Sequence, residues 1–186
     1  MVKNYNEVLY ANEMMDTGRL LLRKFRVEDA GDILEYAGDA QTVEFLVWDG
    51  LNTIEAARAA IYDYYWARNA IWAIELKEGS KVIGCIDLRL MHDHDKAEFG
   101  YVLNRSFWGK GYMTEALQAV LALCFDKLEL NRVEACHYVG NEGSGRVMEK
   151  AGMKCEGRTA QSVKIKGVFR DNVLYGITKE QYNSLL

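Results

Sequence analysis

The sequence contains no proline among its 186 residues, and it has neither low-complexity segments nor internal repeats. Because linkers between domains are usually rich in proline, glycine or polar residues, nothing in this chain marks a boundary. We therefore expect a single domain over residues 1–186, with an N-terminal extension (1–16) before a core at 17–178. This length is enough for one sizeable hydrophobic core and is short for two.

Long apolar runs and paired cysteines are also missing. No run approaches the roughly 18 residues that span a bilayer, and the start, MVKNYNEVLYANEMMD, lacks the basic and apolar segments of a secretory signal. We therefore expect a cytoplasmic protein without a membrane partner. The cysteines form no CxxC pair, so we expect reduced core thiols rather than disulfides; they are Cys85, Cys124, Cys136 and Cys155.

The chain has no excess of basic residues. Its net charge is −4, which argues against nucleic acid as the main partner. Residues 1–66 carry 6 Lys and Arg against 12 Asp and Glu, whereas residues 67–186 carry 17 against 15. The acidic first third favours a cationic substrate, and the mildly basic remainder favours an anionic one.

Only three histidines are present, and two of them lie in the segment His92-Asp93-His94-Asp95. Alternate residues of a strand share a face, so this segment could suggest a metal site. It is an isolated polar turn without a third, distant ligand, and we expect no metal there. His137 is expected to be a core or lining residue within a strand.

Hydrophobic periodicity predicts the order β-αα-βββ-α-β-α-ββ. Strands are expected at 17–25, 71–77, 81–90, 96–104, 132–139, 153–164 and 168–177, and helices at 27–38, 52–69, 112–128 and 143–152. In the second helix, Asn52 is the expected N-cap and Glu55 completes a capping box. The order predicts a mixed α/β sheet, antiparallel first and parallel where the crossover helix returns, with helices on both faces.

The segment SFWGKGYMTEALQAV, residues 106–120, places two glycines at the start of a predicted helix. Backbone amides at a helix N-terminus are unpaired and positively polarised, and glycine lets a phosphate approach them. Lys110 adds charge, and the Thr114 hydroxyl can donate a hydrogen bond. A Walker A loop is disfavoured because Tyr112 follows the second glycine, and the dinucleotide fingerprint fails because Thr114 replaces its third glycine. The segment suits a pyrophosphate.

Two longer stretches carry a specific resemblance. AEFGYVLNRSFWGKGYMTEA (97–116) resembles motif A of the GNAT acetyltransferases, and NRVEACHYVGNEGSGRVMEKAGMKCEG (131–157) resembles their motif B. GRLLLRKFRVEDAGDI is similar to the opening strand and helix of the family, so the resemblance covers residues 17–178. It is closest to the RimJ/RimL-type branch, which acetylates ribosomal-protein N-termini and assorted small amines. The resemblance implies the GNAT fold and acetyl-CoA as cosubstrate.

The resemblance also implies how acetyl-CoA is held. The pyrophosphate is expected on the amides of residues 109–114, and the pantetheine arm beside the fourth strand, paired with its backbone like an added strand. For the arm to fit there, the fourth strand must separate from the strand beside it, and this separation would need a bulge. Asn141 is expected to bond the pantetheine amides. The full expected set is Val102, Leu103, Asn104, Trp108, Gly109, Lys110, Gly111, Tyr112, Met113, Thr114, Asn141 and Ser144.

The catalytic residues follow less directly. Many GNAT enzymes place an acid tyrosine where this chain has Met148, so Ser144 is the expected donor to the thiol, with a simple helix cap as the alternative. Glu98 is the expected base, with a solvated strand residue as the alternative. RimL-like proteins carry a second acidic residue, after motif B, that could act as the base. In this chain that position falls on or near Val163, so this base is missing. Lesser base candidates are Asp87 and Tyr175, and a backbone N–H near Val102 or Leu103 would bind the oxyanion.

The acceptor is expected to lie against the first two helices and the last hairpin, at Glu35, Phe45, Trp48 and Tyr65, with Glu44 and Tyr62–Trp66 nearby. Acidic groups and aromatic walls suit an ammonium, although Tyr62, Tyr65 and Trp66 also show the spacing of core residues. Deprotonating a lysine at pH 7 costs about 4.6 kcal/mol, but an α-amine only about 1–1.4 kcal/mol.

Because the sequence shows no evident strong base, the expectation tilts towards an acceptor that is easily deprotonated. Such an acceptor is an α-amine, on a peptide or ribosomal-protein N-terminus, or another weakly basic small amine. Because Met148 leaves the chemistry open, a non-catalytic acyl-CoA-binding sensor or interaction module is the alternative. Polyamine and antibiotic or other metabolite amines are alternatives within the enzyme class. Homodimers are common among similar proteins, and the edge of a mixed sheet offers a surface for one.

Overall fold

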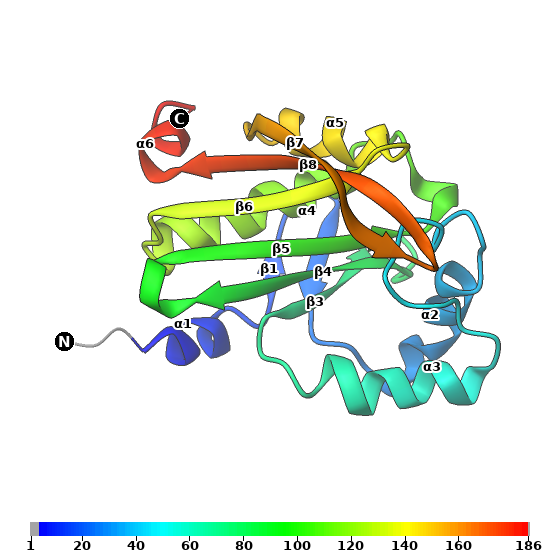
Figure 1. The fold of residues 1–186 in the computed structure, drawn as a ribbon. Coiled ribbons are helices and arrows are strands. Elements are labelled where there is room, and N and C mark those ends of the chain that lie inside the picture. The colour runs from blue at the N-terminus through cyan, green and yellow to red at the C-terminus, as the bar shows by residue number, and fades with distance from the viewer. Residues whose placement is uncertain (1–3, 186) are drawn as a thin grey trace.

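A single eight-stranded sheet runs through the computed structural model, which describes residues 4–185 (Figure 1). Its strand order is β1-β2-β3-β4-β5-β6-β8-β7. The strands are β1 Met15–Asp16, β2 Leu20–Arg23, β3 Ile71–Leu76, β4 Val82–Met91, β5 Lys96–Leu103, β6 Arg132–Tyr138, β7 Lys154–Ile165 and β8 Val168–Thr178. The helices are α1 Tyr5–Ala11, α2 Ala30–Ala37, α3 Ile54–Ala60, α4 Tyr112–Ala122, α5 Glu142–Lys150 and α6 Lys179–Asn183.

The predicted mixed α/β architecture and element order are confirmed. The strands β5 and β6 are parallel, and the other neighbouring strands are antiparallel. The elements α1, β1 and α6 were not predicted. Within the expected N-terminal extension, residues 5–16 belong to the folded core, because Tyr5 and Leu9 of α1 are buried in it and β1 pairs with β2.

Helices cover both faces of the sheet, as expected. One core lies between the sheet and α4 and α5, and it includes Trp72, Phe99, Leu117 and Met148. The other lies between the sheet and α2 and α3, and it includes Ile33, Tyr36, Ile61 and Val102. Met148 is fully buried, so the position where many relatives carry a tyrosine is filled here by an apolar side chain in the core.

The start and end of α3 differ from the prediction. Thr53, not Asn52, is the N-cap, and its hydroxyl accepts a hydrogen bond from the Ala56 amide. Glu55 is then the second helical residue, one short of the position that closes a capping box. The helix widens into a π turn at Ile61–Tyr65, which shifts the aromatic stripe. As a result Tyr65 is buried, whereas Tyr62 and Trp66 are 51% and 48% exposed.

Two of the cysteines also differ from the prediction. Cys85 and Cys124 are buried, but Cys136 is half-buried and Cys155 is exposed. Cys155 lies on β7, the last strand in the order of the sheet, and its side chain faces solvent.

The strands β5 and β6 separate soon after they meet. They pair from Lys96–Glu98 to Arg132–Glu134, although β5 continues to Leu103 and β6 to Tyr138. The expected bulge is absent, because β4 and β5 pair without a register shift. The gap arises because β6 keeps pairing with β8 along its whole length and follows that strand away from β5.

The β7–β8 hairpin bends away from the sheet towards the loop that follows α2 (Figure 1). The predicted turn at Lys166-Gly167 is confirmed, with φ of 47° and 84°. The Lys166 ammonium donates to the Val43 carbonyl over 2.8 Å, and the Arg170 guanidinium lies 4.8 Å from the centre of the Phe45 ring. The hairpin and this loop therefore close one side of the gap between β5 and β6.

The His92–Asp95 segment forms one helical turn between β4 and β5. The Asp95 carboxylate accepts a hydrogen bond from the Tyr5 hydroxyl, so this turn anchors α1. Among residues 4–185, no group of three or more His, Cys, Asp or Glu side chains is arranged to hold a metal ion. In the same residues, none of the helices has the length and apolar character needed to cross a membrane.

Candidate active site

Two cavities meet at the gap between β5 and β6. The larger has a volume of about 590 Å³ and the smaller about 230 Å³. Six residues line both: Phe45, Leu46, Tyr101, Val102, Asn141 and Ser144. A molecule in one cavity and a molecule in the other would therefore meet beside Ser144.

The larger cavity ends at the loop that precedes α4. Gly109 and Gly111 have φ of 73° and 80°, a left-handed conformation that favours glycine. Gly111 is the N-cap of α4 and has no side chain to bond the first amides of that helix. An added Cβ at Gly109 would contact nothing within 4 Å. The loop therefore leaves the amides of Tyr112, Met113 and Thr114 open to an anion.

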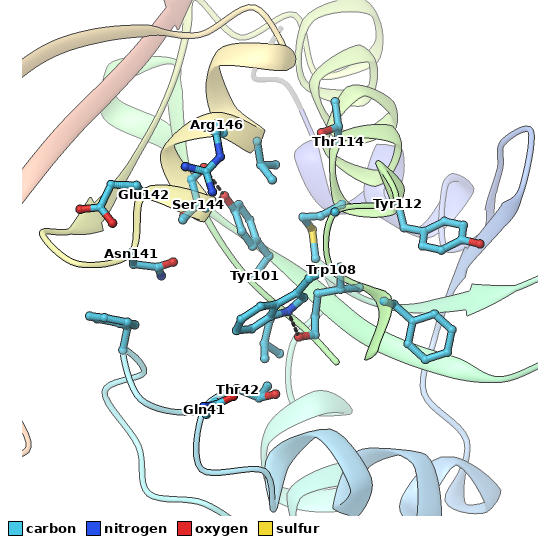
Figure 2. Close-up of a pocket in the computed structure, with 18 of the residues that line it drawn as sticks. Gln41, Thr42, Tyr101, Trp108, Tyr112, Thr114, Asn141, Glu142, Ser144 and Arg146 are labelled. Carbon is cyan, nitrogen blue, oxygen red and sulfur yellow. Dashed lines mark hydrogen bonds between the residues drawn. The ribbon is translucent and has the colours of Figure 1, made fainter. Parts of the chain in front are cut away.

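A charged cluster holds this loop against β2. The Arg19 guanidinium donates to the Glu115 carboxylate over 2.7 Å and to the Lys110 carbonyl over 3.0 Å, and it lies 4.4 Å from the centre of the Tyr112 ring. Burial alone would raise the pKa of Glu115, but hydrogen bonds from Thr17 and Arg19 lower it. Figure 2 shows the Tyr112 ring pointing away from the cavity.

The edge of β5 forms one wall of the larger cavity. The Asn104 amide donates to the Ile83 carbonyl over 2.7 Å. Hydrogen-bonded pairs alternate along an antiparallel ladder, so the β4–β5 register turns the backbone groups of Val102 and Asn104 towards β4. It turns those of Tyr101 and Leu103 towards the gap. The Trp108 indole donates to the Leu103 carbonyl over 2.7 Å, so the amides of Tyr101 and Leu103 are the backbone donors left beside the cavity.

The residue Ser144 does not cap α5. The N-cap is Asn141, whose side chain makes no capping hydrogen bond. The Ser144 hydroxyl lies 2.8 Å from the Tyr101 hydroxyl, which also donates to the Ser144 carbonyl over 2.9 Å. Burial raises the pKa of Tyr101 well above its ordinary value. In Figure 2, Ser144 and Tyr101 meet between α5 and β5, with Asn141 at the adjoining end of the cavity.

The smaller cavity has a charged floor and aromatic walls. Arg89 bonds Asp87 over 2.5 Å and lies 3.3 Å from Glu98, so three charged side chains form one group with a net charge of −1. Burial raises the pKa of Asp87, although Arg89 opposes the shift. The aromatic residues around this group include Trp48, Tyr64, Tyr65 and Tyr138.

The larger cavity has a buried hydroxyl in its lining. Thr42 is 7% exposed, and its Oγ1 makes no hydrogen bond of good geometry in the described part of the chain, although the hydroxyl lies close enough to the Asp39 carboxylate to help lower the pKa of Asp39. Thr42 lies on the loop after α2, on the opposite side of the cavity from α5 (Figure 2). Buried hydroxyls are normally bonded, so this atom is suited to a polar group of a ligand.

A family model described as acetyltransferase (GNAT) domain matches residues 19–154. The chain belongs to the GNAT acetyltransferase family. It is therefore an N-acetyltransferase, and enzymes of this family transfer the acetyl group of acetyl-CoA to an amine.

This acetyltransferase is 30% identical over 175 residues to the N-acetyltransferase p20 of Bacillus licheniformis, which covers 91% of this chain and 98% of p20. Over 79 residues, 42% of this chain and 41% of the other, it is 32% identical to the ribosomal protein uS5-alanine N-acetyltransferase of Escherichia coli. The crystal structure of a GNAT acetyltransferase from Bacillus anthracis superposes with a TM-score of 0.82 at 29% identity, covering 90% of this chain and 99% of that one. These matches support the RimJ/RimL-like branch.

Most sequence-predicted site residues of this acetyltransferase line the two cavities. The larger cavity is lined by Val102, Leu103, Trp108, Gly109, Gly111, Tyr112, Met113, Thr114, Asn141, Ser144, Glu44 and Phe45. The smaller is lined by Glu98, Asp87, His137, Trp48, Tyr64 and Tyr65, as well as Phe45.

Three of the predicted site residues line neither cavity. The Glu35 carboxylate accepts hydrogen bonds from the Lys81 ammonium over 2.7 Å and from the Asn104 side-chain amide over 2.8 Å. These bonds lower the pKa of Glu35. Asn104 is 4% exposed, and its side-chain oxygen also accepts from the Ser106 amide, so it holds the end of β5. The Lys110 ammonium lies 5.2 Å from the Phe107 ring centre. Their expected contacts with ligands stay predictions.

Tyr175, a lesser base candidate, also lies outside both cavities. It is 5% exposed and donates to the Glu149 carboxylate over 2.9 Å, and burial together with this carboxylate raises its pKa to about 12. A tyrosine with a raised pKa that already donates to a carboxylate is poorly suited to accept a proton.

Tyr101, Arg89 and Thr42 were not among the site residues expected from the sequence. Tyr101 lies on the same side of β5 as the core residues Ala97 and Phe99, so its spacing resembled that of a core residue. The one signal for a role in the site was its hydroxyl group, since Ala97 and Phe99 on the same side of the strand are apolar. Thr42 lies in a loop without periodicity, and nothing in the sequence indicates that its hydroxyl is buried.

Proposed function

We propose that this GNAT enzyme binds acetyl-CoA in the larger cavity and acetylates a primary amine held in the smaller one, by direct attack in a ternary complex. The observation that carries the proposal is the junction of the two cavities at Tyr101, Val102, Asn141 and Ser144. A thioester at that junction would face an amine without an intermediate carrier on the protein.

Three features of the larger cavity fit acetyl-CoA. The left-handed glycines and uncapped amides at the start of α4 suit a pyrophosphate. The backbone edge at Tyr101 and Leu103 can pair with the pantetheine amides. The buried Thr42 hydroxyl and the Asn141 side chain, which does not cap α5, are further polar partners.

In the proposed reaction, the neutral amine attacks the thioester carbonyl, and a new C–N bond forms as the carbonyl oxygen becomes an oxyanion. The Leu103 amide is one of the backbone donors at this edge, and it would stabilise that charge. The C–S bond then breaks with both electrons leaving on sulfur. The nitrogen loses one proton, and the thiolate gains one.

Ser144 is the proposed donor to the thiolate. Because its hydroxyl lies 2.8 Å from that of Tyr101, a proton lost from Ser144 could be replaced from Tyr101. Tyr101 also bonds the Ser144 carbonyl, so it fixes this turn of α5 relative to β5. The Ser144–Tyr101 pair would thus do the work of the acid tyrosine that many GNAT enzymes carry at the position of Met148.

The Asp87–Arg89–Glu98 group is the proposed acceptor floor. Its net negative charge and the surrounding aromatic rings favour an ammonium over an anion. Before attack the ammonium must lose a proton. Asp87 is the better suited of the two carboxylates because burial raises its pKa, so Glu98, the base expected from the sequence, is the second choice and orients Arg89.

The proposal is tested by measuring thiol release from acetyl-CoA with a panel of acceptors at equal concentration. The panel contains short peptides with free α-amines, the same peptides with blocked N-termini, polyamines and amino sugars. We expect turnover with at least one class and loss of turnover when its amine is blocked. Binding of acetyl-CoA without turnover across the panel would instead support an acyl-CoA sensor.

A further inference from the structure

Two cationic side chains of the larger cavity have no role in the proposed reaction. Arg146 and Lys150 both line this cavity and project from α5. They are four residues apart, so they lie on the same face of the helix, one turn from each other. Within residues 4–185, neither forms an ion pair with a carboxylate. Figure 2 shows Arg146 extending from α5 beside the cavity.

Three arginines near the two cavities do have carboxylate partners. Arg19, Arg89 and Arg105 each bond a carboxylate. Arg146 and Lys150 are the only cations among the described residues that line the larger cavity. Because neither is held in an ion pair, both side chains can also contact an anion from outside the chain.

Two acidic residues also line this cavity, and both lie next to the acceptor side. They are Glu44 and Glu142, and each directly adjoins in sequence a residue that also lines the smaller cavity, Phe45 or Asn141. The Glu142 carboxylate accepts a hydrogen bond from the Gly140 amide, and bonds from its own amide and from Gly140, together with the charge of Arg146, lower its pKa. Glu142 precedes Arg146 by one helical turn and offsets part of its charge, whereas Lys150 lies a further turn away along α5.

The order of residues along α5 matches the order of groups in the proposed donor. Ser144 lies at the junction where the thioester would be, and Lys150 follows six residues later, a rise of about 9 Å along the helix. The pyrophosphate already has its amides at the start of α4. A second phosphate beyond it would be the 3′-phosphate on the ribose of CoA, a monoester that carries about −1.5 to −2 charges at pH 7.

We propose that Arg146 and Lys150 form a subsite that binds the 3′-phosphate of CoA. This proposal rests on the proposed function, because it assumes that CoA occupies the larger cavity. The subsite would let the enzyme select CoA over the same molecule lacking this phosphate, through charge-assisted hydrogen bonds from one face of α5.

The test compares the dissociation constants of CoA and 3′-dephospho-CoA by titration calorimetry at low ionic strength. For the unaltered enzyme we expect CoA to bind about tenfold more tightly. In Arg146→Gln and Lys150→Gln the ratio should shrink, and in the double variant it should approach one because dephospho-CoA binding barely changes. Added salt should reduce the ratio in the unaltered enzyme.

Lys154→Gln is the matched control. Lys154 is an exposed cation on β7 four residues beyond Lys150, and it lines neither cavity, so this variant should keep the full ratio. Equal affinities for the two ligands in the unaltered enzyme would overturn the subsite. So would a double variant that weakens both ligands equally, because the cations would then act on the pyrophosphate. If the unaltered enzyme binds neither ligand, the proposed function itself fails.

Discussion

The two cavities are built from different parts of the chain. The larger depends on backbone, namely the amides at the start of α4 and the edge of β5, and residues 101–114 supply much of it. The smaller depends on side chains from β4, β5, β6, the loop after α2 and the π turn after α3. A backbone site suits a donor that stays the same throughout the family. A side-chain site can change its acceptor by substitution without altering the fold.

The largest expected effect tests the backbone site. Gly111→Val should weaken acetyl-CoA binding about a hundredfold or more, because Gly111 has φ of 80° and a β-branched residue is strained there. The new side chain would also approach Arg19, which holds the loop. Titration calorimetry measures the loss.

Gly79→Val is the control for strain alone. Gly79 has φ of 79° in the turn between β3 and β4, and an added Cβ there meets nothing within 4 Å. It should lower the melting temperature, as Gly111→Val does, yet leave acetyl-CoA affinity unchanged. Similar losses of affinity in both variants would show that the phosphate loop has no special role.

The next effect lies at the junction. Ser144→Ala should reduce kcat about a hundredfold while changing the acetyl-CoA dissociation constant little, because the hydroxyl is proposed to act on the leaving thiolate. Tyr101→Phe should reduce kcat less, since it leaves the Ser144 hydroxyl in place. Pre-steady-state thiol release and calorimetry separate the two quantities. Equal losses of affinity and turnover in Ser144→Ala would argue for a binding role only.

The side-chain site is tested through Asp87. Asp87→Asn should reduce kcat/KM for the amine about tenfold, with acetyl-CoA affinity unchanged. Because burial raises the pKa of Asp87, its carboxylate is protonated on acidification at a higher pH than the usual value of about 3.9. The resulting acid limb of kcat at saturating amine should disappear in Asp87→Asn. The acid limb should persist in Glu98→Gln; its loss there instead would make Glu98 the base.

The same contrast explains how much the sequence could predict. The start of α4 was predictable because its glycines, amides and helix lie within a few consecutive residues. The separation of β5 from β6 was foreseen, but its cause was not, since β8 draws β6 away through pairing over a long sequence distance. The ring of Tyr101 and the group Asp87–Arg89–Glu98 depend on strand register, which periodicity does not determine.

A smaller effect concerns the cluster that holds the phosphate loop. Glu115→Gln should lower the free energy of unfolding at pH 7 by about 1 kcal/mol, since it weakens charge-assisted hydrogen bonds that are partly exposed. The pKa of Glu115 is lowered in the fold, so its contribution is present above the unfolded value of about 4.3. It is lost as the pH falls through the folded pKa.

Denaturant unfolding of Glu115→Gln and the unaltered enzyme should therefore differ at pH 7 and converge once the pH falls below the lowered pKa of Glu115 in the fold. Acetyl-CoA affinity should fall only a few-fold, because the amides of α4 remain in place. A difference that grew on acidification would mean that the carboxylate is not stabilised by Thr17 and Arg19 in the fold.

The smallest expected effect is that of Tyr175→Phe. Tyr175 lies beneath α5, and its hydroxyl bonds Glu149 rather than facing either cavity. Removing that hydroxyl should cost about 1 kcal/mol of stability and leave kcat and acetyl-CoA affinity within about twofold, although the ring lies close to Gly145 of α5. Steady-state kinetics beside thermal unfolding measures both. Because Tyr101→Phe removes the same atom from a residue at the junction, a larger loss of turnover in Tyr175→Phe would reverse the assignment of the two tyrosines.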